Sequence, residues 1–257
     1  MHRLQQFVAD IGETPGPLTV FFRDDDVGWG NNRLEALCER FGNFDIALDL
    51  AVIPAALDGR TESLLAMVLD RHDRLLHLHQ HGYTHTNHQP FGRKCEFGPD
   101  RSAAAQLEDI VGGRRRLLAA FGERVEPLFT PPWNRCTSAT CEVLSDQGFT
   151  GLSRIAGSDD IELHGLREVS VAVDWHKSHA GERLGRDAFF RYAAERFSAY
   201  DCIGIMLHHE LMDDEELDYF SSFLESIRQS ARVRLRSMID LVENNNDRGE
   251  RREAFLT

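Results

Sequence analysis

Cysteine is scarce in this chain, and its spacing excludes two common architectures. The 257 residues include only five cysteines, an odd number without a CxxC pair. Disulfide frameworks use an even set of cysteines, and cysteine zinc sites usually contain CxxC pairs. We therefore expect reduced, structural thiols at Cys38, Cys95, Cys136, Cys141 and Cys202.

Long apolar runs are also absent. No segment approaches the ~20 apolar residues that a membrane-spanning helix requires. The first 17 residues contain no apolar core of the kind found in signal peptides. These absences predict a cytoplasmic protein without a membrane partner.

The chain lacks an excess of basic residues. It contains 29 Lys and Arg against 42 Asp and Glu, which gives a formal net charge of -13. A field of this sign repels nucleic acid and anionic membranes, so both are excluded as partners. A neutral or locally cationic substrate fits the overall charge better. The oligomeric state has no signature in the sequence.

No linker rich in proline, glycine or serine divides the sequence, and no repeat of fixed period occurs in it. We therefore predict one catalytic domain spanning residues 1–257, with a core at about 16–243 and a flexible tail at 244–257. Short apolar runs alternate with segments of helical period, the pattern of parallel βα units. Strands are expected at 18–23, 45–54, 74–80, 126–132, 149–155, 167–175 and 201–209, with helices at 31–41, 61–72, 102–122, 138–148 and 213–229. Asn31 or Asn32 is expected to cap the first helix and Thr61 the second.

Polar side chains follow several of these predicted strands. In parallel α/β folds, active groups lie where strands end in loops. Carboxylates or imidazoles occur at four such ends, so they are expected to meet on one face. The segments are "FFRDDDVGW" with Asp24, Asp25 and Asp26, "LHLHQHGYTH" with four histidines, "VAVDWH" with Asp174 and His176, and "MLHHE" with His208 and His209.

Each group also has a structural interpretation. Three aspartates after a strand are often a solvated turn. His81 and His85 have the spacing of one face of a helical turn, which suits two ligands of one ion but also occurs on exposed helices. His77 and His79 alternate along a strand and could be packed core residues. The conjunction of carboxylate, histidine pair and late histidine favours a metal hydrolase.

A resemblance to a known family rests on five segments in order, "FRDDD", "HGYTH", "FTPPWN", "VDW" and "IMLHH". They resemble the successive motifs of the polysaccharide deacetylases, carbohydrate esterase family 4, over about three quarters of the chain. The resemblance implies an α/β fold, a deformed (β/α) barrel of about seven parallel strands. It also implies hydrolysis of an N-acetyl or O-acetyl group on a carbohydrate or related small molecule.

The resemblance further implies one divalent metal, usually Zn2+, and a role for each motif residue. The metal ligands would be Asp26, His81 and His85. Asp25 would be the general base and His208 the general acid. Two histidines and one carboxylate leave open positions on a metal that lowers the pKa of water to about 7. Substrate contacts are expected from Trp133, Asn134, Trp175, Asp174 and His209, with Trp29 at the rim of the cleft.

Three positions depart from the family pattern. A third aspartate allows Asp24 with Asp25 as the functional pair, although "DDVG" favours Asp25 with Asp26. Gly82 stands where serine or threonine usually follows the first histidine. Thr130 stands where an arginine normally holds the base carboxylate, so Arg23 or Asn134 is expected to orient Asp25 instead, and Asp174 loses its customary arginine partner.

Two other functions remain open from the sequence. An amidohydrolase-type enzyme would use the HxH of His77 and His79, although that motif normally ends the first strand of its barrel. A catalytically inactive member of the deacetylase fold, binding carbohydrate or metal, is favoured by Thr130. The retained Asp25, Asp26 and histidines oppose it. Without a signal peptide, a small or lipid-linked acetylated sugar, or another N-acyl compound, is the expected substrate.

Overall fold

One parallel sheet organises the part of the chain that the computed structural model describes, namely residues 4, 6, 7, 11 and 16–244. The strands follow the order β6-β5-β4-β3-β2-β1-β10-β7, and β11 pairs with the start of β1. The strands are β1 (Leu18–Val27), β2 (Leu48–Val52), β3 (Leu76–His81), β4 (Val125–Thr130), β5 (Gly151–Leu152), β6 (Arg167–Glu168), β7 (Val171–Asp174), β10 (Cys202–Leu207) and β11 (Val233–Leu235).

The sheet closes on itself through β6 and β7, which only two residues separate. Val171 pairs with Ile155 on one side and with Gly204 of β10 on the other. When β6 and β7 are counted as one interrupted strand, β1 to β5, β6/β7 and β10 form a ring of seven parallel strands. The prediction of a deformed barrel of about seven strands is confirmed. The deformation lies at β5, where pairing is short.

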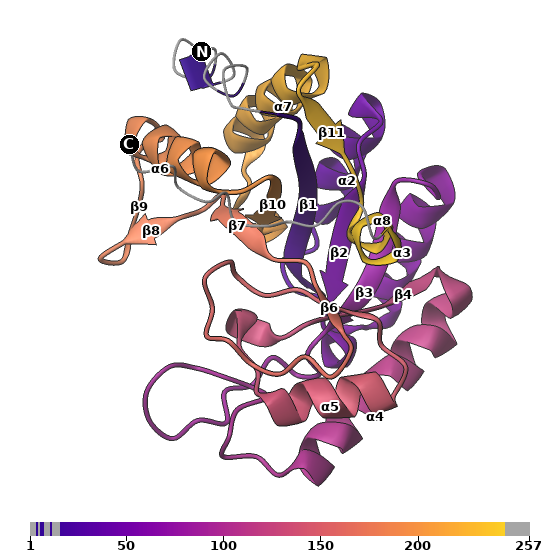
Figure 1. Cartoon of the computed structure of the whole chain (residues 1–257). Coiled ribbons are helices and arrows are strands. Elements are labelled where there is room, and N and C mark those ends of the chain that lie inside the picture. The colour runs from indigo at the N-terminus through magenta and orange to yellow at the C-terminus, as the bar shows by residue number, and fades with distance from the viewer. Residues whose placement is uncertain (1–3, 5, 8–10, 12–15, 245–257) are drawn as a thin grey trace, which may run out of the picture.

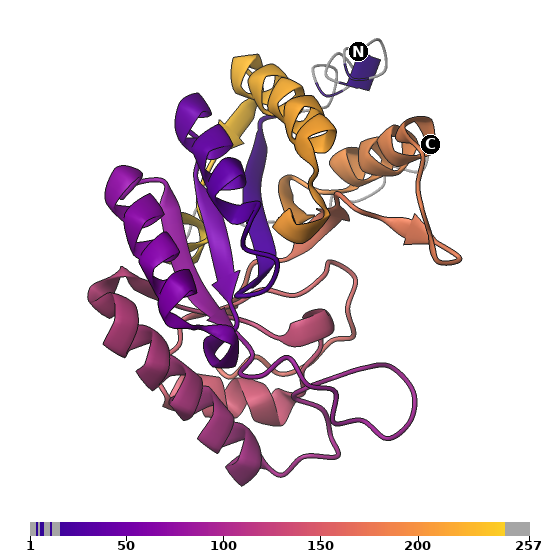
Figure 2. The same cartoon turned by 180° about the vertical axis from the view of Figure 1, so that it is seen from behind.

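Helices cover the outer face of this barrel, as Figures 1 and 2 show from opposite sides. Along β1, Val20 and Phe22 pack outward into the cluster that includes α2 and α7, whereas Phe21 belongs to the interior cluster. This alternation follows from the two-residue period of a strand. The helices are α2 (Leu34–Phe44), α3 (Gly59–Arg71), α4 (Ala103–Phe121), α5 (Ser138–Asp146), α6 (Arg186–Ala199), α7 (Asp214–Gln229) and α8 (Met238–Glu243).

Helix α8 packs against the barrel interior beside the starts of the strands. Met238 and Leu241 of α8 share a buried cluster with Phe21 and Met206. Gly204 makes room for this cluster, because a Cβ atom there would lie 2.3 Å from Cζ of Phe21. Polar residues at the opposite, carboxyl ends of the strands are therefore left to form a site.

Two predicted helix caps are wrong. Helix α2 begins at Leu34, and its N-cap residue, Arg33, makes no side-chain capping bond. Asn31 links the loop after β1 to helix α3 instead, accepting from the Gly28 amide and donating to the Thr61 hydroxyl. Asp58 caps α3, because its Oδ1 accepts from the Thr61 amide at 2.8 Å. Asn31 and Asn32 do precede their helix, but Thr61 lies inside α3, so both helix starts were misplaced.

Several elements were not predicted from the sequence. These are α6, α8, β11 and the hairpin of β8 (Ser178–His179) and β9 (Glu182–Arg183). The Ser237 and Asp240 side chains form a capping box on α8, a signal that the sequence does contain. The predicted flexible tail falls largely on residues 245–257, which lie outside the described residues.

All five cysteines are free. Within residues 16–244 and the few described residues before them, none of the helices combines the length and the apolar character that crossing a bilayer requires.

Candidate metal centre and active site

Three predicted metal ligands converge at the carboxyl edge of the barrel. Asp26 lies at the end of β1, His81 is the last residue of β3, and His85 lies in the connection that follows. The Nε2 atoms of both histidines lie 3.1 Å from Oδ1 of Asp26. The ligand atoms of the three residues fall within 4.8 Å of one another, as one metal ion requires.

The histidine pair does not lie on a helical turn, which corrects the expected local structure. His81 ends a strand, and the chain then turns through Gly82 (φ 56°) and His85 (φ 56°). The long connection after β3 projects from the barrel in Figures 1 and 2. Proximity of the two rings, 5.1 Å between centroids, therefore comes from a loop reversal.

Glu96 holds that reversal in place. Its carboxylate, which is fully buried, accepts from the amides of Tyr83 and Thr84 and from the Thr84 hydroxyl. A Cβ atom on Gly82 would lie 2.2 Å from Oε2 of Glu96, so only glycine fits beside this carboxylate. Glycine therefore stands where the family has serine or threonine, and Glu96, which is distant in the sequence, holds the turn in place.

The hydrogen-bond pattern of His81 fits a metal ligand. The carbonyl of Thr130 accepts from Nδ1 of His81 at 3.0 Å, so Nδ1 carries a proton. In the neutral ring, the lone pair of Nε2 then points at the carboxylate oxygen of Asp26. Both atoms are hydrogen-bond acceptors, so they repel each other. A cation between these atoms removes that repulsion. A backbone acceptor on the opposite ring nitrogen is also the usual partner of a metal-bound histidine.

The charges in this cluster stabilise one another. Burial raises the pKa of Asp26, but the hydrogen bonds with His81 and His85, together with the charges of these rings, outweigh burial and lower the pKa far below its ordinary value. Burial lowers the pKa of His81, whereas its contacts with the Asp26 and Asp25 carboxylates raise it more strongly. The site therefore keeps Asp26 ionised, the state in which a carboxylate binds a metal.

Arg23 orients Asp25, one of the two alternatives expected from the sequence. Its Nε and Nη2 donate to the two carboxylate oxygens at 2.7 and 2.8 Å. Both side chains are buried, at 0% and 3% exposure. Burial raises the pKa of Asp25, but the charge and hydrogen bonds of Arg23, together with the charges of His81 and His208, outweigh burial, and the net shift is downward.

Two further partners fix the Arg23 guanidinium. Nη1 donates to the Ser153 hydroxyl and Nη2 to Oδ1 of Asn134, both at 2.7 Å. Asn134 thus acts through Arg23 rather than on Asp25 directly. The arginine that the family provides after the fourth strand is thus replaced by one from β1, two residues before Asp25.

Thr130, at the position of the family's arginine, belongs to a different contact. Its hydroxyl hydrogen-bonds Nε2 of His79 at 2.8 Å, while His77 contacts Glu126. Burial and the charge of Arg23 lower the pKa of His79 to about 3. Neither histidine of the HxH joins a metal-ligand group among the described residues, which disfavours the amidohydrolase interpretation.

His208 lies beside the cluster, and its side chain is 26% exposed. Its Nε2 is 3.8 Å from Oδ2 of Asp26, and its Nδ1 has no hydrogen-bond partner among the described residues. Asp174 accepts a hydrogen bond from the His176 amide. Burial raises the pKa of Asp174, and the charge of His208 opposes that rise. Asp174 thus lies within the electrostatic influence of His208, and none of the described residues is an arginine partner of it.

Two tryptophans enclose His85. The Trp29 ring lies 5.0 Å from the His85 ring, and the Trp133 ring lies 4.5 Å from it. Trp29 remains 40% exposed, which agrees with its expected place at the rim. Trp133 has a left-handed backbone conformation (φ 55°) in the turn Pro132–Asn134 that ends β4.

Two predicted substrate residues lie away from any accessible surface. His209 is 0% exposed, with Nδ1 bonded to Asp24 and Nε2 to the carbonyl of Trp29. Trp175 is 1% exposed and packs against Phe189 and Phe220. Direct substrate contact by either side chain is therefore wrong for this structure. Asp24 is bonded to His209 in the interior, whereas Asp25 pairs with Arg23 and Asp26 contacts His81 and His85.

A second group of potential ligands, His88, Glu96 and Asp109, has its carboxylates engaged elsewhere. Glu96 holds the Tyr83–Thr84 backbone, and Asp109 pairs with Arg101 at 2.6 Å. Glu96 and Ser153 were both missed by sequence reasoning. No local pattern marks them, because each acts on residues more than ten positions away.

We predict that Gly82→Ser, which restores the family's usual residue, weakens the site instead of improving it. The serine Cβ would collide with Glu96, and its backbone would remain at positive φ, at a cost of about 1–3 kcal/mol. Zinc titration and urea denaturation measure the two effects. Gly92→Ser is the control, because Gly92 also has positive φ but its Cβ would meet nothing within 4 Å. Equal effects of the two substitutions would contradict the proposed clash.

Comparisons with known proteins identify the fold. No known family model matches the sequence, and no curated protein matches it. Among solved structures, a protein from Mycobacterium smegmatis assigned as a polysaccharide deacetylase superposes with a TM-score of 0.69 at 14% identity, covering 90% of this chain and 93% of its own. The chain has the polysaccharide deacetylase fold.

Other polysaccharide deacetylase structures agree. A peptidoglycan N-acetylglucosamine deacetylase has a TM-score of 0.56 at 11% identity, with 92% of this chain and 93% of that chain covered. A mutant of a CE4 family pseudoenzyme with restored activity has a TM-score of 0.59 at 13% identity, covering 90% and 69%. The fold thus occurs in both active and inactive proteins, so activity must be argued from the site.

Proposed function

We propose that this protein is a metal-dependent deacetylase that hydrolyses an N-acetyl or O-acetyl group of a carbohydrate or related small molecule. The observation that carries the proposal is the convergence of Asp26, His81 and His85 beside an Asp25 carboxylate held by Arg23. The polysaccharide deacetylase fold supports the same substrate class.

The ligand set indicates zinc, because two imidazoles and one carboxylate are typical of catalytic zinc sites. A divalent metal held there supplies a Lewis acid for the acetyl carbonyl and a water of lowered pKa. The chain supplies the orientation of its ligands, through the Thr130 carbonyl on His81 and Glu96 on the His85 loop.

Proton transfers are assigned to two side chains. Asp25 is ionised at neutral pH and accepts the proton of the attacking water. His208, which lies beside Asp26 and is partly exposed, donates a proton to the leaving amine or alcohol. Trp29 and Trp133 flank the site and limit access of bulk water.

The test is acetate release from acetylated mono- and oligosaccharides by zinc-loaded protein. We expect Asp25→Asn to reduce kcat by at least about 100-fold, because general base catalysis contributes at that level. Zinc content should stay unchanged, because Asp25 is not a ligand. The isosteric Asp24→Asn is a control for charge loss, although it also perturbs His209. Full activity of Asp25→Asn would contradict the assigned base.

The second candidate is an inactive member of the fold that binds metal or carbohydrate. It was favoured by Thr130 in place of the arginine. Arg23 contacting both oxygens of Asp25 weighs against it, because the base keeps a guanidinium partner. Zinc binding without acetate release from any acetylated sugar would favour this candidate.

A further inference from the structure

A cavity of about 480 Å³ adjoins the candidate metal centre. Trp133 and Asn134 line it. Trp133 also contacts His85, and Asn134 accepts from Arg23, the partner of Asp25. The cavity therefore shares a wall with the site, and a molecule bound at the metal can extend into it.

The cavity is cationic although the chain is strongly acidic. Two arginines without a carboxylate partner among the described residues, Arg93 and Arg135, line it, against one lining carboxylate, Asp159; Arg154 lines it as well. Lys94 adds a further charge nearby, with Nζ 5.8 Å from the centroid of the Trp133 ring. This concentration of positive charge opposes the field that a net charge of -13 produces elsewhere.

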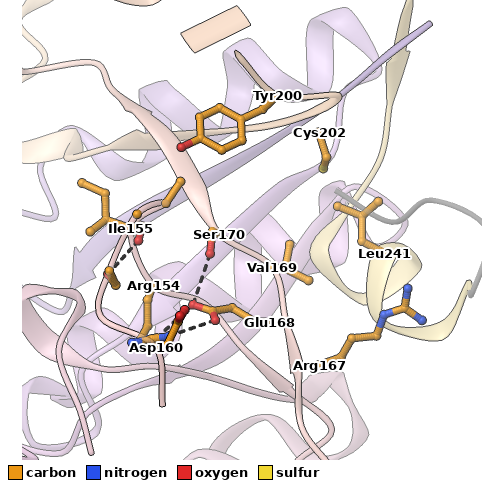
Figure 3. Close-up of a pocket in the computed structure, with 13 residues that line it drawn as sticks. Arg154, Ile155, Asp160, Arg167, Glu168, Val169, Ser170, Tyr200, Cys202 and Leu241 are labelled. Atoms are coloured by element: carbon orange, nitrogen blue, oxygen red, sulfur yellow. Dashed lines mark hydrogen bonds and ion pairs between the residues drawn. The ribbon is translucent and has the colours of Figure 1, made fainter. Parts of the chain in front are cut away.

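Arg154 is not available to a ligand. In Figure 3 its guanidinium is drawn against Glu168, and both Nε and Nη2 donate to that carboxylate at 2.9 Å. Arg154 and Ile155 also line a second cavity of about 450 Å³, the one drawn in Figure 3. The loop that carries them therefore separates the two cavities.

Arg93 and Arg135 have no carboxylate partner among the described residues. Arg93 is exposed, and Arg135 donates only to the backbone carbonyl of Lys94. Burial and the neighbouring charge of Arg93 lower the pKa of Arg135, so the two guanidinium groups repel each other. An anion between them would remove this repulsion.

Neutral donors at the cavity point to the same ligand chemistry. Gln89 lines the cavity, and its buried Nε2 has no hydrogen-bond partner among the described residues. Thr137 and Ser138, at the N-terminus of α5, line it as well. Amide donors and a helix N-terminus both favour negative charge.

We propose that this cavity binds an anionic group of the substrate, a phosphate or a carboxylate, while the acetyl group occupies the metal centre. This inference rests on the proposed deacetylase function and narrows its substrate to acetylated compounds that carry an anionic group. It also revises the expectation from net charge, which favoured a neutral or cationic substrate.

The first test is binding of inorganic phosphate to metal-free protein, measured by calorimetry, so that phosphate on the metal is not detected. We expect Arg93→Gln with Arg135→Gln to weaken binding by about ten-fold or more, because two charge-assisted contacts are lost. The single variant Arg93→Gln, at an exposed residue, should show a smaller loss and guards against misfolding. Arg191→Gln, an exposed arginine of α6, should bind as the wild type does. Absent binding, or equal binding by all four proteins, overturns the proposal.

The second test compares acetate release from N-acetylglucosamine, its 6-phosphate and the corresponding uronic acid. A higher kcat/KM for both anionic sugars that the double variant loses supports an anion site, and a preference for the phosphate alone identifies phosphate. Equal kcat/KM for all three sugars overturns the site but leaves the deacetylase intact. Arginine-dependent phosphate binding without any acetate release supports the cavity and contradicts the deacetylase.

Discussion

Arg23→Met should lower the free energy of unfolding by about 3–5 kcal/mol, because it leaves Asp25 buried without a cation. The substitution removes bonds to Asp25, Ser153 and Asn134 together. Without Arg23 the burial of Asp25 is unopposed by its largest favourable charge, so the pKa of Asp25 rises. Urea denaturation measures the stability, and the acid limb of kcat/KM for acetate release should move to higher pH.

The double variant Arg23→Met with Asp25→Asn separates the two effects. It should recover most of the lost stability, because no charge is left unpaired, but it should remain inactive because the base is absent. If Arg23→Met unfolds within about 1 kcal/mol of the wild type and keeps its pH profile, Arg23 does not hold the base.

Stability should fall as the pH rises from 5 to 8, and Asp49 should cause much of that fall. Asp49 is fully buried in β2; its Oδ2 accepts from the Met238 amide, and its Oδ1 has no partner among the described residues. Burial raises the pKa of Asp49 to about 7, from 3.8. The folded state therefore binds the proton more tightly than the unfolded state does.

The proton on Asp49 makes the folded state more stable at low pH than at high pH. Stability from the bound proton is complete below the unfolded pKa and is lost as the pH rises through the folded pKa, a change of about 3 kcal/mol between pH 5 and 8. Asp49→Asn should remove this part of the pH dependence, whereas Asp45→Asn, at an exposed loop residue, should retain it. Urea denaturation at several pH values makes the comparison. Parallel curves for the wild type and Asp49→Asn would show that Asp49 does not titrate in this range.

The barrel could be predicted because the information is local and repeated. Most strands are short apolar runs, the helices α2, α3, α4, α5 and α7 have an apolar period, and the parallel order follows from their alternation. Caps and short elements could not be predicted as well. Asp58 and Thr61 are both good capping residues three positions apart, and only the path of the chain decides between them.

The candidate site could be predicted where its residues follow strands, and not where they act at a distance. Asp26 and His81 come directly after apolar runs, so the shared edge of the sheet brings them together. Glu96 lies in the connection after β3, which has no such pattern, and Ser153 was missed although it directly follows β5, because its partner Arg23 is 130 positions away. His209 shows the opposite error, because a histidine next to the site in the sequence begins the turn after β10 and pairs with the buried Asp24.

The most direct test of a metal centre at Asp26, His81 and His85 is zinc content by elemental analysis of the purified wild type, Asp26→Ala and His81→Ala, each dialysed against zinc. About one zinc per wild-type chain is the expected result, with loss in both variants. His88→Ala is a matched control from the second ligand group and should keep its zinc. A wild type that binds no zinc, or variants that keep it, would contradict the metal centre and the deacetylase mechanism built on it.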